Sequence, residues 1–177
     1  MIGNFKIIGI IFLFLIFSCK KQNGAIEDGR ELITENINVL LDSVEFFDTS
    51  RMPVSSVSLK DFKKYKPVKI KQIKIGLLDS ITNENLTSNE KSKFVKFNIG
   101  KNEIFNFRSK YIIEILKINN YDSNILFVKF SNFRIENNLA NIEVKKVSGI
   151  SMTHHKYYFK KKNGRWVFIK KELLGIG

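Results

Sequence analysis

The sequence predicts an α+β fold, in which an N-terminal amphipathic helix packs on a mainly antiparallel, curved β-sheet that ends in a hairpin meander. Apolar residues recur at helical spacing between residues 32 and 44. Through most of the last third of the chain they alternate with polar residues instead, as in strands. An Asn163-Gly164 pair between two aromatic, lysine-rich runs is the strongest short-range signal for a hairpin.

The chain begins with a charged head, an unbroken apolar run and a small residue before its only cysteine. The apolar run from Ile7 to Phe17 is too short to cross a bilayer, since a spanning helix needs about twenty residues. Lys6 precedes the run and Ser18-Cys19 follows it, which is the layout of a secretory signal. We therefore expect three parts: a signal peptide at 1–18, a tether at 19–26 and a single α+β domain at 27–177.

The segment Leu15-Ile16-Phe17-Ser18-Cys19 resembles the lipobox of bacterial lipoproteins, which has an aliphatic residue three positions before the cysteine and a small residue directly before it. The resemblance implies that Cys19 becomes the lipid-modified N-terminus, where several acyl chains together give a stable membrane anchor. No other cysteine would then remain for a disulfide. A core cysteine after a hydrophobic strand and a signal peptide cut at a different position are the alternatives.

The composition, rich in Lys, Ile and Asn, resembles that of lipoproteins of the Bacteroidota. Those lipoproteins tend to reach the cell surface when acidic residues closely follow the cysteine. Here the cysteine is followed by Lys20-Lys21-Gln22-Asn23-Gly24, which contains no acid. The resemblance thus favours a lipid anchor in the outer membrane facing the periplasm over display at the surface.

The first element of the domain is an amphipathic helix, expected from about Glu27 to Phe47. Its early acids, Glu27, Asp28 and Glu31, complement the positive N-terminal end of the helix dipole. Its apolar stripe, which we expect to join the core, consists of Leu32, Ile33, Ile37, Leu40, Leu41 and Val44.

The patterns between the helix and the last third are weaker. A capping-box pattern predicts a short helix at 58–65, and residues 68–76 alternate with one slip, which predicts a strand with a bulge at Gln72. Residues 79–93 are polar and predict a loop with at most one helical turn. Two further strands are expected: residues 94–99, with Val95, Phe97 and Ile99 on one face, and the chain after Tyr111, where residues 104–118 also fit a helix.

Two hairpins are predicted at the end of the chain. The first joins residues 126–131 to residues 140–145. In the second, a type I′ turn at Asn163-Gly164 sets the cross-strand partners. The expected pairs are Lys162 with Arg165, Lys161 with Trp166, Phe159 with Phe168 and Tyr157 with Lys170, so that Tyr157, Phe159, Trp166 and Phe168 share one face.

The ending from "NNLANIEV" through "YYFKKKNGRW" resembles the close of many small secreted Bacteroidota proteins. It is also similar to the ending of nuclear-transport-factor-like, or cystatin-like, α+β domains. That resemblance implies a curved sheet wrapped around an N-terminal helix, with a pocket at the open end. It assigns no catalytic residue to this chain.

The formal net charge of +13 allows attraction to polyanions such as lipopolysaccharide phosphates, although a solvated lysine surface accounts for the same charge. Alternation predicts two lysine ridges that point mostly to solvent. They consist of Lys69, Lys71 and Lys74, and of Lys156, Lys160 and Lys162. Secretion argues against nucleic acid as the partner.

The sequence contains little that suggests catalysis. His154 and His155, the only histidines, are adjacent in a strand and point to opposite faces, so we expect no metal site there. The strand carboxylates Glu114, Glu136 and Glu143 lack an evident partner and are expected to be solvated; the alternative is that they line a pocket. No phosphate-binding or dinucleotide glycine motif is present, and we expect no cofactor.

These patterns favour a lipid-anchored envelope protein that acts as a non-enzymatic binding or structural module, with an envelope protein or a polyanion as partner. The alternative is a cone-shaped domain whose pocket binds a small molecule or acts on it as a hydrolase or isomerase.

Overall fold

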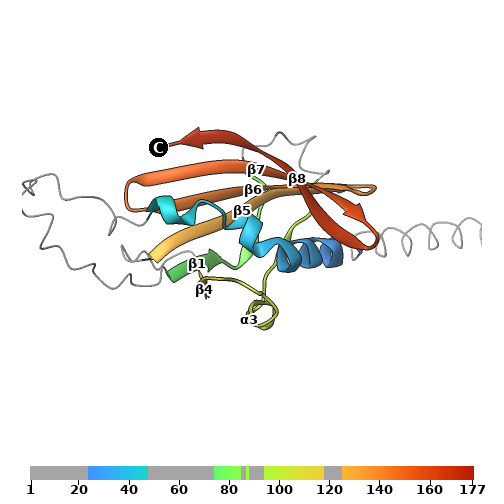
Figure 1. Cartoon of the computed structure of the whole chain (residues 1–177), viewed down its shortest axis with the longest axis horizontal. Helices are drawn as coiled ribbons and strands as arrows, with labels where there is room; N and C mark the ends of the chain where they lie inside the picture. Colours follow the sequence, from blue (N-terminus) through green and yellow to red (C-terminus); the bar gives the residue numbers. More distant parts are fainter. Residues whose placement is uncertain (1–23, 48–73, 85–86, 88–93, 118–124) are drawn as a thin grey trace, which may run out of the picture.

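The protein has the predicted α+β fold. In the computed structural model, an N-terminal helix at residues 24–40 packs on one face of a six-stranded sheet that is mixed but mostly antiparallel (Figure 1). The structure describes residues 24–47, 74–84, 87, 94–117 and 125–177.

Several predictions concern residues outside these ranges. They are the lipid anchor at Cys19, the helix at 58–65, the bulge at Gln72, and the orientation of Lys69 and Lys71.

The predicted apolar stripe of the helix is confirmed, because all six of its side chains are buried against the sheet. The predicted extent of the helix is wrong at its end. The α-helix stops at residue 40, and after a turn the chain continues as the 3₁₀ helix η1 (Val44–Phe47). Ser43 has a φ of 61° and so leaves the right-handed region, which interrupts the α-helical hydrogen-bond ladder at this point.

The sheet consists of a short parallel part and a long antiparallel part. β1 (Lys74–Leu78) pairs in parallel with β4 (Ile112–Leu116) on one side and with β5 (Ile125–Glu136) on the other. From β5 the chain continues through β6 (Leu139–Ser148), β7 (Ser151–Lys162) and β8 (Arg165–Ile176) as an antiparallel meander. The strand after Tyr111 and both C-terminal hairpins are therefore confirmed, whereas the parallel pairs were not predicted.

The segment predicted as a loop at 79–93 contains regular structure. β2 (Ser80–Ile81) pairs with β3 (Phe97–Asn98), and Thr82 forms an isolated parallel bridge to β5. β3 is shorter than the strand predicted at 94–99. Its predicted apolar face is correct, since Phe97 and Ile99 are buried and Val95 packs against the core. The short helix α3 (Lys101–Ile104) follows.

A bulge in β5 changes which side chains face the helix. The pairing with β6 shifts between Ser131 and Arg134, and Asn132 adopts a φ of 49°, which Asn tolerates better than most residues. Phe133 is consequently fully buried, and its ring meets that of Phe97 edge to face at 5.7 Å. Gly29 of the helix permits this contact, because a Cβ atom there would lie 2.6 Å from the Phe97 ring.

The C-terminal hairpin has the predicted turn, with φ angles of 50° at Asn163 and 80° at Gly164. The three predicted pairs nearest the turn are confirmed, but Tyr157 faces Lys171 instead of Lys170. The cause is a register shift in β8, where Ile169 is an extra residue. A second shift makes Leu174 an extra residue near the end of the strand.

The helix-facing side of this hairpin carries Tyr157, Phe159 and Trp166 as buried residues of the core, with Phe168 at its partly exposed edge. The Phe159 and Phe168 rings meet at 5.9 Å. Trp166 lies at the helix, where its main-chain nitrogen donates to the Glu35 carboxylate at 2.9 Å and its carbonyl accepts from the Asn36 side chain at 3.0 Å.

Among the described residues, no helix is both long and apolar enough to cross a membrane.

Replacement of Trp166 by alanine should lower the free energy of unfolding by about 3–5 kcal/mol, because it empties a buried aromatic site. The matched control is Val167→Ala on the opposite face of the same strand, where the side chain is 42% exposed. The control should cost less than about 1 kcal/mol in urea-induced unfolding. Equal effects of the two changes would show that the indole does not belong to the core.

Candidate functional site: a buried lysine clasp and an outer hollow

A fully buried lysine lies among the apolar residues on the helix-facing side of β6. Lys146 Nζ donates to the Asp42 main-chain carbonyl, to Asp42 Oδ1 at 3.1 Å and to the Tyr157 hydroxyl at 3.3 Å. The Tyr157 hydroxyl donates to Asp42 Oδ1 at 2.5 Å, and Lys171 Nζ donates to Asp42 Oδ2 at 2.5 Å. We call Asp42, Lys146, Tyr157 and Lys171 the clasp.

The clasp lies where the helix ends, and its geometry explains why a charge is tolerated there. The last carbonyls of a helix lack partners within the helix, and the Asp42 carbonyl is in the turn directly after it. An ammonium has three protons to donate, and the three acceptors around Lys146 Nζ match that number.

The environment shifts the pKa of each group in the clasp. Burial alone would raise the pKa of the Asp42 carboxyl, but the bonds from Lys171, Tyr157 and Lys146 outweigh it and lower that pKa. Burial lowers the pKa of Lys146, and the nearby Asp42 carboxylate opposes this effect only in part. Burial and the bond to Asp42 raise the pKa of Tyr157. At neutral pH, Asp42 is therefore ionised and Tyr157 is protonated.

Shifted pKa values are also a mark of catalytic sites, but the clasp lacks access. The Lys146 side chain is only 1% exposed, and its three protons are all committed to protein acceptors. A nucleophile or base must come within hydrogen-bond reach of a substrate atom. The clasp therefore serves to attach the end of the helix to the sheet.

The two histidines point to opposite faces, as predicted. His155 lies on the helix-facing side, with its ring 6.1 Å from that of Tyr157, and burial lowers its pKa, helped by the charges of Lys171 and Lys146. His154 lies on the outer face, where its Nε2 is 3.2 Å from Glu143 Oε2. Among the described residues, no three His, Cys, Asp or Glu side chains are grouped as a metal site requires.

The prediction that the strand carboxylates are solvated is confirmed for Glu114 and Glu136, whose side chains are 50% and 64% exposed, and is wrong for Glu143, whose side chain is 13% exposed. The prediction that they lack partners is wrong for all three. Besides His154, Glu143 accepts from the Asn132 side chain at 2.9 Å and lies 3.9 Å from Lys156 Nζ. Cross-strand neighbours supply these contacts, which the pattern along a single strand does not reveal. The other two carboxylates also have basic partners: Glu114 pairs with Lys74 at 3.8 Å, and Glu136 with Arg134.

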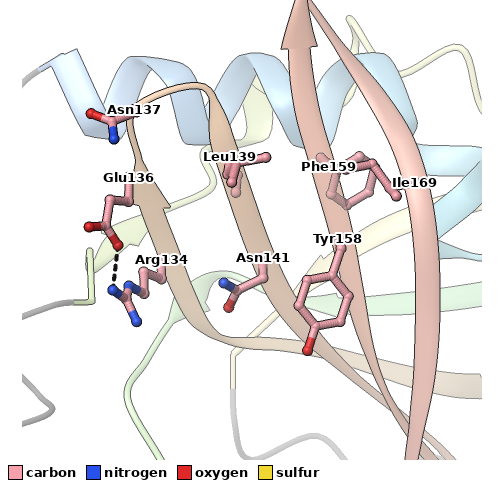
Figure 2. Close-up of a pocket in the computed structure, with 9 residues that line it drawn as sticks. Arg134, Glu136, Asn137, Leu139, Asn141, Tyr158, Phe159 and Ile169 are labelled. Carbon is pink, nitrogen blue, oxygen red and sulfur yellow. Dashed lines mark hydrogen bonds and ion pairs between the residues drawn. The ribbon is translucent and has the colours of Figure 1, made fainter.

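A surface hollow of about 450 Å³ lies on the outer face of the sheet, at the end formed by the β5–β6 hairpin (Figure 2). We call it the outer hollow. It is open to solvent and brings together residues from all four strands of the meander. Its walls include Arg134, Glu136, Leu139, Asn141, Tyr158 and Ile169.

The outer hollow combines exposed apolar groups with polar ones. Leu139 and Ile169 expose more than half of their surface, and the buried Asn141 Oδ1 has no hydrogen-bond partner among the described residues. The bond from Tyr158 to Glu172 raises the pKa of Tyr158 to about 12, so this hydroxyl is not a base at neutral pH. The exposed apolar side chains can contact a ligand, and the exposed Glu136 carboxylate can accept a hydrogen bond from it.

A second surface hollow, of about 810 Å³, lies between the helix and the start of β8. We call it the helix groove. Asn38 holds one wall in place, since its amide donates to the Arg108 carbonyl at 2.7 Å and its oxygen accepts from the Lys110 main-chain nitrogen at 3.0 Å. Phe105 in this wall is almost fully exposed. Arg108 and Arg165 line the helix groove without an ion pair to another described residue.

Sequence reasoning missed the clasp, although one signal for it was available. Ala140, Ile142 and Val144 point toward the helix, and continuing the same alternation places Lys146 inward and Lys145 outward. A lysine at a core position requires a partner. That partner, Asp42, is 104 positions away, and no local pattern identifies it.

Comparisons of the chain with protein-family models, with curated proteins and with solved structures give no match. Its function must therefore be inferred from its own residues.

The clasp predicts unequal effects of removing the Asp42 charge and the Lys146 charge. Asp42→Asn leaves the buried Lys146 ammonium without a carboxylate and should cost about 3–5 kcal/mol. Lys146→Met leaves Asp42 with Lys171 and Tyr157 and should cost about 1 kcal/mol. Urea-induced unfolding at pH 7 measures both values, and a Lys146→Met variant less stable than Asp42→Asn would contradict this account.

The same variants test a pH dependence. The folded state holds the pKa of Asp42 below its usual 3.8, so the unfolded chain takes up this proton first as the pH falls. The ionised Asp42 carboxylate therefore stabilises the folded state fully at pH values above its ordinary pKa of 3.8, and this stabilisation is lost as the pH falls through the folded-state pKa. The acid-induced loss should be smaller in Asp42→Asn than in the unmodified protein, as measured by unfolding midpoints between pH 5 and pH 2.

Proposed function

We propose that this protein is a lipid-anchored envelope protein that acts as a non-enzymatic binding module, and that the outer hollow is its contact site for a protein partner. The observation that carries the proposal is the lining of the outer hollow. Exposed Leu139 and Ile169 line it together with the exposed Glu136 carboxylate, an arrangement suited to apolar contact and hydrogen bonding.

The side chains of the outer hollow also support binding over catalysis. Tyr158 is protonated at neutral pH and bonded to Glu172, and Arg134 is paired with Glu136. A general acid or base would need a pKa near the working pH. The pKa of Tyr158, raised to about 12, does not meet this requirement.

The packing between helix and sheet argues against an internal pocket of the cone type. The side chains there are mostly apolar and almost completely buried. Among the polar groups, Lys146 and Tyr157 are bonded to Asp42, and the Asn36 amide is bonded to the Leu32 and Trp166 carbonyls. Both hollows described above open to solvent instead.

The outer face carries both signs of charge, which supports a protein partner over a polyanion. Lys156 lies near Glu143, and Lys170 donates to Glu172 at 2.6 Å. Both ammonium groups also lie over the Tyr158 ring, 5.9 and 4.8 Å from its centroid. Carboxylates between the lysines reduce the attraction to phosphates.

The lipid anchor rests on the lipobox-like segment before Cys19. Intact-mass measurement of the membrane-extracted protein should give a chain that begins at Cys19 and carries acyl chains. Cys19→Ala should lose incorporation of an alkyne-tagged palmitate and should no longer remain with the membranes. An N-terminus at another residue, or membrane retention of Cys19→Ala equal to that of the unmodified protein, would refute the anchor.

The outer hollow can be tested by photo-crosslinking in the producing cells. Benzoylphenylalanine at Leu139 should give a discrete adduct with an envelope protein, because this position is exposed at the hollow. The matched control is the same amino acid at Ile150, which is fully exposed at the β6–β7 turn outside the hollow.

Adding Asn141→Lys to the Leu139 variant should remove the adduct, since the long charged side chain would occupy the hollow. An adduct that survives this change, or that forms equally from position 150, would show that the outer hollow is not the contact site.

A further inference from the structure

The proposed function leaves the helix groove unused, although hydrogen bonds to the helix hold both of its walls in place. On one side, Asn38 bonds the main chain of residues 108–110 between α3 and β4. On the other side, Glu35 and Asn36 bond the main chain of Trp166 at the start of β8. The walls are therefore positioned before any ligand arrives, which lowers the cost of binding.

Each wall contributes an exposed arginine, Arg108 on one side and Arg165 on the other. Neither guanidinium forms a hydrogen bond or an ion pair with another described residue. Other basic side chains on or beside the helix are paired with acids, namely Arg30 with Glu103, Lys110 with Glu45, and Lys161 with Asp28 and Glu31. The helix groove thus offers two guanidinium groups, which bind carboxylates through two parallel hydrogen bonds.

The helix groove also exposes apolar surface next to these charges. The Phe105 side chain is 87% exposed and lies in the same wall as Arg108, while Val167 in the β8 wall is 42% exposed. An aromatic ring that is this open to water is stabilised when an apolar group covers it. A ligand that fits both features therefore has an anionic group and an apolar group.

An acidic side chain in the helix groove limits the charge of such a ligand. Glu35 lines the groove, and its Oε2 accepts from the Trp166 main-chain nitrogen at 2.9 Å. This carboxylate repels an anion with two negative charges, such as a phosphate monoester, more strongly than an anion with one. The helix groove accordingly favours a singly charged ligand.

We propose that the helix groove binds an organic carboxylate, that is, a molecule with one carboxylate and an apolar group beside it. The carboxylate accepts from Arg108 and Arg165, and the apolar group packs on Phe105 and Val167. The site shares no lining residue with the outer hollow, so it is independent of the proposed function.

The same ligand chemistry has two sources. The volume of about 810 Å³ is within the range of small-molecule sites, and the helix groove is open to solvent at its surface. A small organic acid and the C-terminal end of a peptide with an apolar last residue both present a carboxylate beside an apolar group. The experiment therefore includes one probe of each kind.

Isothermal titration calorimetry on the detergent-solubilised full chain tests the ligand class. The probes are 4-phenylbutyrate, as the small acid, and N-acetyl-Ala-Ala-Phe with a free C-terminal carboxylate. Each acid is compared with its own neutral amide, after subtraction of the heat of titration into detergent alone. The acids should bind about tenfold more tightly than the amides, because only the acids can accept charged hydrogen bonds from both arginines.

The two acids distinguish the sources of the carboxylate. A peptide acid that binds about tenfold more tightly than 4-phenylbutyrate would identify a peptide end as the ligand. Binding of 4-phenylbutyrate with equal or higher affinity would identify a small organic acid.

Arginine variants test the site itself. Arg108→Gln and Arg165→Gln should each weaken binding of the acids about tenfold, because each removes a charged donor. Arg165→Lys keeps the charge but loses the planar fork, and it should retain part of the affinity. Both arginines are exposed, so urea-induced unfolding should be unchanged and separates lost binding from lost folding. The matched control is Arg134→Gln in the outer hollow, which should bind the acids like the unmodified protein.

Glu35→Gln tests the charge of the helix groove in the opposite direction. This variant keeps an oxygen that can accept from the Trp166 main-chain nitrogen but removes the negative charge, so the acids should bind more tightly. Equal binding of acids and amides, unchanged binding in both arginine-to-glutamine variants, or tighter binding of inorganic phosphate than of either acid would overturn the proposal. The absence of binding by both acids would overturn it as well.

Discussion

The attachment of the helix end to the sheet is the interaction on which the rest of the structure depends. A buried ammonium is costly unless its protons are bonded and a counter-charge lies close by. Lys146 meets both conditions only when the turn after the helix brings the Asp42 carbonyl and carboxylate to β6. The bonds to Asp42 that stabilise the buried Lys146 ammonium therefore also fix the end of the helix against β6.

A second attachment orients the other end of the helix. Lys161, next to the hairpin turn, donates to Asp28 at 2.6 Å and to Glu31 at 2.8 Å in the first turns of the helix. Tyr157, four residues earlier in β7, reaches Asp42. One strand thus contacts the beginning and the end of the helix, and the apolar stripe between these contacts is held against the core (Figure 1).

The two faces of the sheet consequently differ in character. The helix-facing side is filled with apolar side chains, and the clasp residues there are bonded to one another, so it supports the fold. The outer face carries the hollow, the Glu143 contacts and the lysines around Tyr158, where a partner has access.

Much of the fold follows from local sequence patterns. The helix stripe, the Asn163-Gly164 turn and the pairs next to it depend on residues close together in the chain, where periodicity and φ preferences act directly. In β8 the pairing counted from the turn was wrong at Tyr157, because the extra residue Ile169 shifts its partner from Lys170 to Lys171.

Other features were decided only by the tertiary structure. Sequence alone indicated an α+β chain with a buried helix stripe and a C-terminal meander. It did not indicate that β1 lies in parallel between β4 and β5, that the bulge at Asn132 turns Phe133 inward, or that Lys146 meets Asp42. The outer hollow was likewise not indicated, because its walls combine side chains from four strands. The physical reason is that hydrogen-bond and charge partners far apart in the chain leave no periodic signal, whereas apolar burial repeats with the geometry of each helix and strand.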